Sequence, residues 1–542
     1  MLTKWQATNP ATTVPEAVRF LSGRNLKELK TPLRLSPRKI EKLPEAANLI
    51  FRCVEEKRHI SIIGDYDADG VTASAILFLL LQSLGVTPDI RLPKRMTEGY
   101  GLSEKIVDEV LTKNKDGLLL TVDNGIVANK AIQKAKDAGL TVIVMDHHLP
   151  GKELPPADVL VDQWAAAGEE MPSNYYCGAG LALKLAQYMI PENPELLRKL
   201  TALAAIGTIG DVMSLTGDNR AIVKEGLLAI SRGDTTSGLQ SLLSAMGKSR
   251  YDSTTIAFYI VPAINASGRL LDDGARMPCA VLAADRPVPK SADKLREINE
   301  SRKRLVEEQL DRILNEYPDA LKRIPIVIFA DFVYEGIAGI LAGKLTETYH
   351  VPSIVFAKKN DTVWKGSARS IPNIHLKHHL DTISDTMLGY GGHAGAAGLS
   401  VEDAKRDAFI AAAQKAFFDV KPAPADVGFY DVELKEADVP TQYKEQLALE
   451  PYGEGCPKPV VCVRGCQLKE KRPGEKAFYM GATKQHVKLS CADFVILGFF
   501  LAEEYKEMGE PAVVDVFGHL DENTSQFGTE LQLVADAILP AK

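Results

Sequence analysis

The chain has 542 residues, of which 45% are hydrophobic and 25% are charged, and its formal net charge is −7. This length is enough for three or four domains, and the composition is typical of a globular protein. We expect no membrane-spanning segment and no signal peptide, because the apolar stretches are too short and the first residues lack an apolar core. The negative charge excludes a uniformly basic nucleic-acid coat, so a phosphate-rich partner must be held by local basic patches or by metal.

The seven cysteines are an odd number and are scattered along the chain. This usage predicts reduced thiols and therefore a cytoplasmic protein. Cys456, Cys462 and Cys466 lie close together in sequence but lack the C-x-x-C spacing of zinc sites, so the pattern does not favour zinc.

Residues 1–45 form an N-terminal leader in which basic residues outnumber acidic ones. The leader is either a solvated helical cap, which is the interpretation we favour, or a basic rim that faces phosphates. Its basic positions include Arg24, Lys27, Lys30, Arg34, Arg38, Lys39 and Lys42.

The first domain is expected to span residues 46–285, and its first part, 46–165, alternates between runs typical of strands and runs typical of helices. Short connections between alternating strands and helices predict an α/β fold with a doubly wound parallel sheet. From about residue 177 to 245 the pattern is largely helical. The predicted strands are 59–64, 117–122, 141–145 and 158–161, and the predicted helices of the sheet region lie near 70–85, 103–113 and 127–138.

Three further units follow the first domain. Residues 286–316 are highly charged and carry leucine and isoleucine at helical spacing, which predicts a long linker helix. Residues 317–424 begin with an apolar run at 325–330 and continue with helix-like and strand-like segments, which predicts a second, smaller α/β domain. Residues 425–542 consist of short alternating runs typical of a small β-barrel.

Acidic residues follow three of the predicted strands of the first domain. Asp65, Asp67 and Asp69 follow the first strand, Asp123 follows the second, and an Asp-His-His triplet at 146–148 follows the third. The carboxyl ends of neighbouring parallel strands meet at one edge of a sheet, so these groups are expected to converge there. Carboxylates with one or two imidazoles suit Mn²⁺ or Mg²⁺, and several carboxylates favour two ions acting in phosphoryl displacement.

Other interpretations of the acidic residues remain open. Residues 65–70 begin like an EF-hand loop, but position 12 is Ile76 instead of glutamate and a strand precedes the loop, so an EF-hand is excluded. A solvated acidic turn stays an alternative for 65–70, as does a simple turn with Asn124 for Asp123. Asp211 follows an apolar helix and is either a further site residue or a helix-end neighbour.

Eight short motifs occur in order across about residues 46–400. They are GDYDADG at 64–70, EGYGL at 98–102, TVDNGI at 121–126, DHH at 146–148, GTIGDV at 207–212, NASGR at 265–269, GSARS at 366–370 and GGHAGAAG at 391–398. Together they resemble the DHH phosphoesterase superfamily and, within it, the RecJ-type exonucleases that degrade single strands in the 5′→3′ direction. Residues 520–538 resemble the closing strands of the family's OB-fold.

The resemblance implies a DHH domain, a linker helix, a DHHA1 domain and an OB-type β-barrel. It also implies that Asp65 and His148 either bind the metal directly or hydrogen-bond to residues that do. His148 is the candidate for assisting the attacking water or the leaving group, and its alternative is a buried structural role. The implied ligands of two Mn²⁺ or Mg²⁺ ions are Asp67, Asp69, Asp123, His147 and Asp211.

The resemblance also assigns substrate contacts in two motifs. Arg269, Ser367 and Arg369 correspond to the family's pocket for the terminal 5′-phosphate. Asn265 belongs to the same motif as Arg269 and is expected to contact substrate with it. His393, in the glycine-rich motif, is expected to contact the scissile region.

A rim and a glycine-rich stretch complete the implied site. Arg95 and Tyr100 correspond to a rim where a basic and an aromatic residue meet the strand end, and Tyr100 either stacks a base or packs in the core. The glycines of 391–398 either let backbone amides approach phosphate or allow close helix packing. The sequence departs from the family at Val333 and Tyr334, where relatives carry Trp-His.

The expected function is degradation of single-stranded DNA to 5′-mononucleotides by two-metal hydrolysis, in DNA repair and recombination. Single-strand-binding protein and a helicase are the further partners that this function implies. One alternative is a DHH-family phosphodiesterase acting on short RNA or small nucleotides, which the chain length and the terminal barrel disfavour. The other is a catalytically inactive DHH scaffold, which the presence of all the metal-site aspartates disfavours.

The barrel is expected to hold the strand with basic side chains and with stacking by Phe478 and Tyr479. The alternative is that these are ordinary surface residues on a bracing domain. The basic positions are Lys458, Arg464, Lys469, Lys471, Arg472, Lys484 and Lys488.

Overall fold

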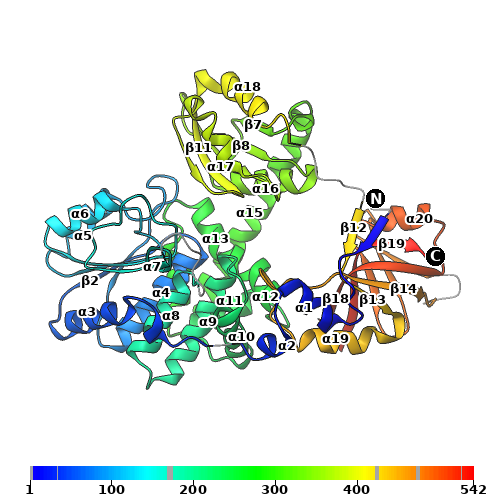
Figure 1. The fold of residues 1–542 in the computed structure, drawn as a ribbon, viewed down its shortest axis with the longest axis horizontal. Helices are drawn as coiled ribbons and strands as arrows, with labels where there is room; N and C mark the ends of the chain where they lie inside the picture. The colour runs from blue at the N-terminus through cyan, green and yellow to red at the C-terminus, as the bar shows by residue number, and fades with distance from the viewer. Residues whose placement is uncertain are drawn as a thin grey trace.

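Four β-sheets organise the part of the chain that the structure describes. The computed structural model describes residues 4–32, 34–167, 175–420, 427–470, 476–481, 483–525 and 528–541. Figure 1 shows three lobes: a first lobe at the left, a second lobe above it, and a barrel at the right. Among the described helices, none is both long enough and apolar enough to cross a membrane.

The first lobe is built on a five-stranded parallel sheet with strand order β3-β2-β4-β5-β6. Its central strands are aliphatic runs buried on both faces, and separate hydrophobic clusters cover the two faces, so the predicted doubly wound sheet is confirmed. The strands are β2 (Ile60–Ile63), β3 (Asp89–Arg91), β4 (Leu118–Val122), β5 (Thr141–Met145) and β6 (Val159–Val161). The helices of this region are α3 (Leu43–Glu55), α4 (Ala68–Ser83), α5 (Glu104–Leu111), α6 (Asn129–Asp137) and α7 (Gln163–Ala167).

Helices make up the rest of the first lobe. Helix α4 is apolar on all sides because it lies between the sheet and two further helices, α8 and α9, which bury it. A five-residue π-helix, η2 (Ile256–Ile260), interrupts the last part of this region. The helices are α8 (Gly178–Met189), α9 (Pro194–Gly210), α10 (Gly217–Arg232), α11 (Ser237–Met246), α12 (Ser253–Thr255), α13 (Val261–Leu270) and α14 (Arg276–Leu282).

The predicted linker helix is α15 (Pro289–Glu316), which rises from the first lobe into the second (Figure 1). The second lobe contains a mixed sheet in the order β10-β11-β9-β8-β7, of which only the β7–β8 pair is parallel. This sheet confirms the second, smaller α/β unit. Its elements are β7 (Ile326–Ala330), α16 (Ala338–Tyr349), β8 (Ser353–Lys358), β9 (Val363–Arg369), α17 (Leu376–Asp381), β10 (Gly389–Gly392), β11 (Ala396–Glu402) and α18 (Arg406–Ala416).

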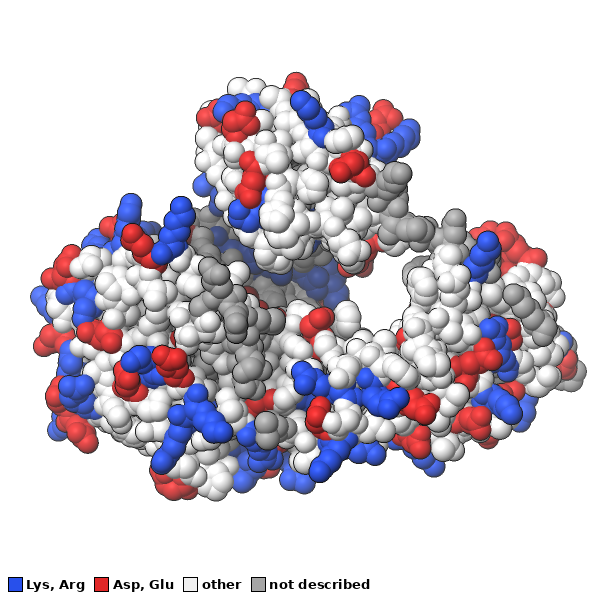
Figure 2. Space-filling view, viewed as in Figure 1, with Lys and Arg blue, Asp and Glu red and all other residues white. Residues whose placement is uncertain are grey.

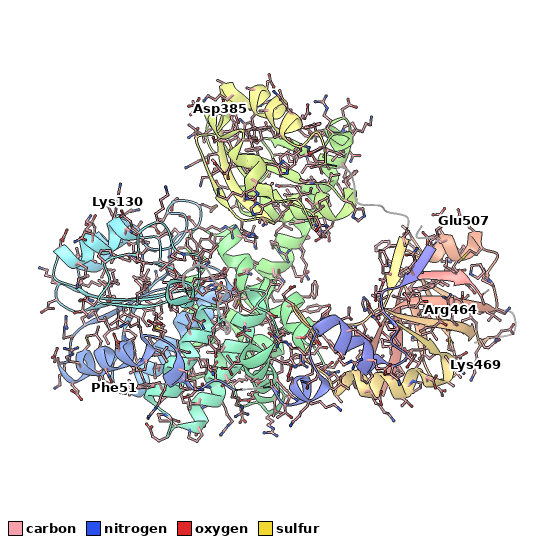
Figure 3. All side chains as sticks on the ribbon, in the orientation of Figure 1. Phe51, Lys130, Asp385, Arg464, Lys469 and Glu507 are labelled. Atoms are coloured by element: carbon pink, nitrogen blue, oxygen red, sulfur yellow. The ribbon has the colours of Figure 1, made fainter. Side chains whose placement is uncertain are left out.

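The last lobe is a seven-stranded sheet that curls around its own hydrophobic core, as an OB-type barrel does. The long β18–β19 hairpin forms its centre, and Figure 3 places Arg464 and Lys469 on this lobe. The elements are β12 (Val427–Tyr430), β13 (Val432–Lys435), α19 (Val439–Leu447), β14 (Val461–Gln467), β15 (Ala477–Met480), β16 (His486–Ser490), β17 (Val495–Gly498), α20 (Ala502–Glu507), β18 (Val513–Ser525) and β19 (Gly528–Pro540).

The N-terminal residues fold with the barrel and do not form a separate leader. Strand β1 (Lys4–Ala7) pairs in parallel with β12, and helices α1 (Val14–Ser22) and α2 (Leu26–Lys30) place apolar side chains in the barrel core. The buried Arg220 then joins three segments, because its guanidinium donates to the carbonyls of Leu29, Leu449 and Pro451. The first lobe is thereby attached to the barrel through buried hydrogen bonds.

Candidate metal and phosphate site

Six side chains from the first lobe form one buried group, which we call the acidic cluster: Asp65, Asp67, Asp69, Asp123, His147 and Asp211. Three of the segments that carry them follow β2, β4 and β5, which are neighbours in the sheet. The fourth is the end of α9, where Asp211 lies. The ligand atoms of Asp69, His147 and Asp211 lie within 4.8 Å of one another, and so do those of Asp65, Asp67 and Asp123. A third set, which adds Asp146 and His148 to Asp123 and His147, connects the two, so the cluster has the size and donor type of a cation site.

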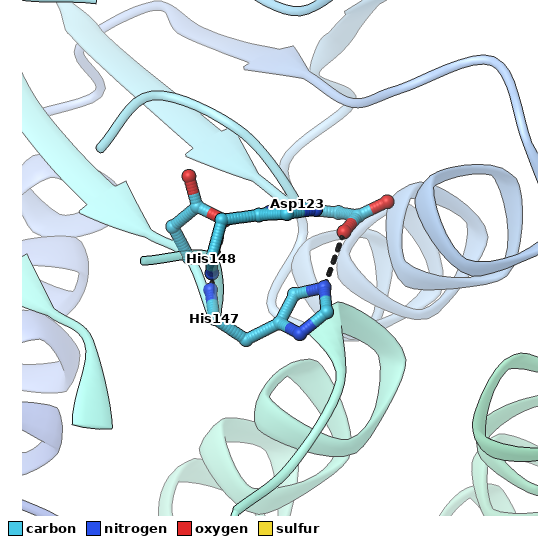
Figure 4. A group of neighbouring side chains, drawn as sticks. Asp123, His147 and His148 are labelled. Carbon is cyan, nitrogen blue, oxygen red and sulfur yellow. Dashed lines mark hydrogen bonds and ion pairs between the residues drawn. The ribbon is translucent and has the colours of Figure 1, made fainter. Parts of the chain in front are cut away.

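His147 lies at the centre of the cluster. Its Nε2 is 2.9 Å from Asp123 Oδ1 and 3.7 Å from Asp69 Oδ2, and its Nδ1 is 3.7 Å from Asp211 Oδ2. Figure 4 shows the imidazole pointing toward the Asp123 carboxylate. The hydroxyl of Tyr175 donates to the His147 carbonyl at 2.6 Å and lies 3.0 Å from Nδ1, which fixes the ring.

Backbone hydrogen bonds orient the Asp69 carboxylate, and backbone conformation places that of Asp123. The Asp69 carboxylate accepts from the N–H groups of Gly178 and Ala179, at 2.6 and 2.9 Å, at the positive N-terminus of α8. A Cβ at Gly178 would lie 2.6 Å from the Asp123 Cβ, so only glycine permits this approach. Asp123 itself has a left-handed φ of 62°, an uncommon conformation that places its side chain at the sheet edge.

Asp146 holds the segment that carries the two histidines. Its carboxylate accepts from the backbone N–H groups of Ile126 and His147, and from Nδ1 of His148 at 2.7 Å. These bonds occupy both oxygens, so Asp146 positions its neighbours. His148 is 43% exposed, which argues against the buried structural role considered for it. The Tyr100 hydroxyl donates to the Asp123 carbonyl and lies 3.0 Å from His148 Nδ1, so Tyr100 belongs to the site wall.

The carboxylates of the acidic cluster carry like charges and repel one another. Burial, and then the neighbouring carboxylates, raise the pKa values of Asp65 and Asp123 well above the usual range and the pKa of Asp211 to about 8. Burial lowers the pKa of His147. Burial also acts to lower the pKa of His148, but the hydrogen bond to Asp146 and the charges of Asp146, Asp211 and Asp69 together outweigh it and raise the pKa to about 9. Asp65 Oδ1 is buried without a hydrogen-bond partner. These features fit a bound divalent cation, which would offset the repulsion.

A second group, which we call the arginine pocket, lies beside the cluster. Arg95 comes from the loop after β3, Arg269 from α13, and Arg369 with Ser367 from β9 of the second lobe. Burial and then the charges of Arg95, Arg302 and Arg369 lower the pKa of Arg269 to about 9. Arg95, Arg269 and Arg369 form no salt bridge among the described residues, so the pocket is suited to an anion.

Tyr66 connects the two groups. It follows Asp65 in the chain, and the Arg95 guanidinium lies 4.9 Å from the centre of its ring. Its carbonyl would be 3.2 Å from a Cβ at Gly268, beside Arg269. The arginine pocket and the acidic cluster are therefore adjacent.

The two lobes meet at the arginine pocket through close backbone contacts. A Cβ at Gly336 of the second lobe would lie 1.9 Å from the Arg269 carbonyl of the first lobe. Tyr334, at the position that departs from the family pattern, donates to the Leu270 carbonyl at 3.1 Å. In this chain Tyr334 therefore contacts the first lobe.

Several residues of this site are not predictable from the sequence alone. Arg302 lies on α15 among many other charged residues, so its sequence context gives no sign that it lies near Arg269. Asp272 accepts from the backbone of Met96 and Thr97 and thereby holds the loop of Arg95, which only the three-dimensional structure reveals. Asn265, which was expected, has a buried Oδ1 without a hydrogen-bond partner near Arg269.

The remaining expected residues lie away from the acidic cluster or are engaged elsewhere. His393 is exposed in the β10–β11 hairpin, and its Nδ1 accepts from the backbone N–H of Gly395. Cβ atoms at Gly391 and Gly398 would meet open space, so these glycines do not serve close helix packing. His375 and His378 stack on each other, with ring centres 3.6 Å apart.

Three of the barrel's expected basic residues are paired with acids. Lys458 bonds to Asp521, Arg464 to Glu433 and Asp515, and Lys488 to Glu530. Phe478 is 57% exposed, as a stacking residue must be. Lys471 and Arg472 lie outside the described residues.

Three family models match the chain in the order of its lobes. The DHH family N-terminal domain matches residues 59–208, the DHHA1 domain matches 325–418, and the RecJ OB domain matches 430–537. The first match contains β2 to α9, the second contains the sheet of the second lobe, and the third contains the barrel.

Curated relatives and solved structures extend this match to most of the chain. The single-stranded-DNA-specific exonuclease RecJ of Dickeya dadantii is 30% identical over 494 residues, covering 84% of this chain and 83% of the relative. The Thermus thermophilus protein of the same name is 33% identical over 531 residues, covering 96% and 75%. The crystal structure of Thermus thermophilus RecJ in complex with Mn²⁺ has a TM-score of 0.82 and 29% identity, covering 99% of this chain and 80% of that one. The chain therefore belongs to the RecJ family of DHH-domain proteins.

Proposed function

We propose that this protein is a metal-dependent exonuclease that hydrolyses single-stranded DNA. The observation that carries the proposal is the position of the acidic cluster, whose buried carboxylates repel one another, directly beside the arginine pocket. The three arginines of that pocket have no acidic partner among the described residues. One group suits divalent cations and the other suits phosphate, and their adjacency fits cleavage near a phosphate-bearing strand end. The names of the relatives support the substrate class, since they are single-stranded-DNA-specific exonucleases.

Mn²⁺ or Mg²⁺ are the proposed cofactors, as two ions. When bound, such ions polarise the phosphate and activate water for in-line displacement. The residues that would hold them are Asp67, Asp69, Asp123, His147 and Asp211, with Asp65 close by. The solved Thermus thermophilus relative is in complex with Mn²⁺ in one crystal structure and with Mg²⁺ in another, which supports this choice.

His148 is proposed to serve the proton transfer. Its ring is held by Asp146 on one side and is accessible to solvent on the other, so it can approach the water or the leaving oxygen. Tyr100 lies against the same ring and closes the wall of the site.

The arginine pocket is proposed to read the terminal 5′-phosphate, which gives a 5′→3′ direction and 5′-mononucleotide products. Ser367 accepts from Arg369 Nη1 at 3.2 Å, so the guanidinium is already oriented before substrate arrives. Arg95, Asn265 and His393 are proposed further contacts. The corresponding biology is DNA repair and recombination in the cytoplasm, alongside a single-strand-binding protein and a helicase, and the seven free, buried thiols support a reducing compartment.

One assay tests the proposal. Purified protein is given Mn²⁺ and strands labelled at the 5′ or the 3′ end, single-stranded or duplex, with a chelator as the control. We expect the 5′ label to be released first as a mononucleotide, only from single strands and only with metal. Exclusive cleavage of dinucleotides or short RNA would indicate the small-substrate alternative, and no cleavage with any metal would indicate a scaffold.

A further inference from the structure

A large aromatic side chain stands in solvent on the π-helix η2. Phe258 is 67% exposed, although a phenylalanine is normally buried. Its local geometry has a cause in the sequence, because Pro262 has no N–H to offer the Phe258 carbonyl four residues earlier. The turn widens instead, and the Val261 N–H bonds to the Ile256 carbonyl five residues back. Single π-turns of this kind are frequent at functional sites.

Two ammonium groups flank the next residue, Tyr259. Lys248 Nζ lies 3.5 Å from the centre of the Tyr259 ring, and Lys303 Nζ lies 5.9 Å from it. Lys303 also pairs with Glu300 at 2.9 Å, whereas Lys248 has no ion pair with an acid among the described residues. Phe258 and Tyr259 are consecutive, so one exposed aromatic ring and two ammonium groups gather around a single turn of the chain. Exposed aromatic rings and cations are the groups that bind single-stranded nucleic acid.

The position of this patch links the arginine pocket to the barrel. Helix α13 continues directly from η2 and carries Arg269 eleven residues after Phe258, which is about 16 Å of helix. On α15, Lys303 follows Arg302, whose charge acts on Arg269. On the other side, Arg250 bonds to Glu450 and Glu522 of the barrel lobe. Figure 2 shows Lys and Arg side chains gathered in the hollow beneath the second lobe.

We propose that Phe258, together with Lys248 and Lys303, forms a stacking step for the body of a single strand whose 5′ end lies in the arginine pocket. This inference rests on the proposed function and names a further contact for the same substrate. A base laid on the Phe258 ring would be held whatever its identity, because every base has a π-face. The two lysines would face the phosphates on either side of that base. A strand held there runs from the pocket toward the barrel across the first lobe.

The test is binding of a single-stranded oligonucleotide to the full chain in the presence of a chelator, so that no cleavage occurs. Replacing Phe258 by Ala should weaken binding by about 5- to 150-fold, the range for loss of one base stack. Phe258→Trp should retain affinity, because it restores a stacking face. Phe418→Ala is the matched control, since Phe418 is 83% exposed on the second lobe and should have no effect. Lys248→Ala should reduce the salt slope of binding by about 0.7.

Oligonucleotides with a single abasic residue make the test independent of protein folding. Moving the abasic residue along the strand should reveal one position, downstream of the 5′ end, where wild-type affinity falls and the Phe258→Ala variant shows no further loss. Equal affinity of wild type and Phe258→Ala for every strand would overturn the stacking step while leaving the proposed function intact, as would an abasic profile identical in both proteins. If the wild type neither binds nor cleaves single strands, the proposed function itself fails, and the stacking step with it.

Discussion

The carboxylate of Asp272 holds Thr97 by two hydrogen bonds, one from its backbone N–H at 3.1 Å and one from its hydroxyl at 2.7 Å. Thr97 lies in the loop that carries Arg95 and Tyr100, and Asp272 lies just after α13, which carries Arg269. The bonds therefore fix two sides of the arginine pocket relative to each other.

Replacing Asp272 by Ala should raise KM for single-stranded DNA about tenfold, equivalent to about 1.4 kcal/mol, with little change in kcat. The loop would lose its anchor, whereas the acidic cluster would remain intact. Steady-state kinetics measure the effect. Asp273→Ala is the control, because among the described residues Asp273 pairs only with the exposed Arg276, and its loss should leave KM unchanged. Equal effects of the two variants would show that Asp272 does not position the loop.

Asp123→Asn should abolish hydrolysis but make the metal-free protein more stable. The substitution removes one of several buried carboxylates that raise one another's pKa values. The loss of activity should exceed about 10–100-fold, which is typical for residues that only hydrogen-bond to a metal ligand. The melting temperature in chelator should rise by about 2–4 °C for each kcal/mol of repulsion relieved. The increase in melting temperature that Mn²⁺ causes in the wild type should disappear. A variant that melts lower than wild type in chelator would contradict the repulsion argument.

Gly178→Ala should weaken metal binding, because the new methyl group would lie 2.6 Å from the Asp123 Cβ and 3.1 Å from Asp69 Oδ2. The carboxylates would have to move apart. Titration with Mn²⁺, followed by melting temperature, measures the change. Gly343→Ala is matched to it, since a Cβ there meets nothing within 4 Å on helix α16, and it should gain up to about 1 kcal/mol of stability with unchanged metal affinity.

Arg369→Ala should reduce use of 5′-phosphorylated strands about 10–100-fold and affect 5′-hydroxyl strands much less. The guanidinium is pre-oriented by Ser367 and has no acidic partner in the part of the chain that the structure describes, so it is available to a terminal phosphate. Competition between the two strand types measures the discrimination. Arg369→Lys should recover only part of it, because lysine lacks the planar fork. An equal loss on both strands would remove Arg369 from end recognition.

The pH dependence of stability should carry a contribution from Glu450 at the junction of first lobe and barrel. Burial raises its pKa to about 7 despite the nearby Arg250 and Lys458, with Asp252 and Glu522 adding repulsion. A carboxyl whose pKa is raised on folding binds more protons in the folded state, so its contribution to stability falls as pH rises from about 5 to about 8. Glu450→Gln should flatten that decline in thermal melts at constant ionic strength. Superimposable pH profiles for the two proteins would refute it.

Much of the fold follows from local pattern. Strand β5 begins and ends where the apolar run predicts, and α15 ends at the predicted residue, because long runs of one period leave little choice. Strand β3 was not predicted, since it has three residues and lies half exposed at the sheet edge. The partner of residues 4–30 was also not predictable, because nothing in a local pattern states which distant surface an amphipathic helix will cover.

In the candidate site, too, some residues could be predicted from local sequence pattern and others could not. The acidic residues are visible in the sequence because each ends a strand and parallel strands share an edge. The anchoring role of Asp272 and the proximity of Arg302 to Arg269 are invisible there, because both depend on how α13, α15 and the rim loop cross. Phe258 is hidden for the same reason, since an apolar residue in a helical segment is normally assigned to the core.

The pairing of β1 with β12 also affects how the chain reaches its final form. Thr8 donates to the Tyr430 carbonyl across a separation of 422 residues. During synthesis on the ribosome, the N-terminal segment emerges first but its partner strand emerges near the end, so α1 and α2 must wait with their apolar faces uncovered. Contacts of such long range are slow to form, because a large loop must close first. The barrel is therefore expected to be the last lobe to fold, after the two lobes of the nuclease are complete.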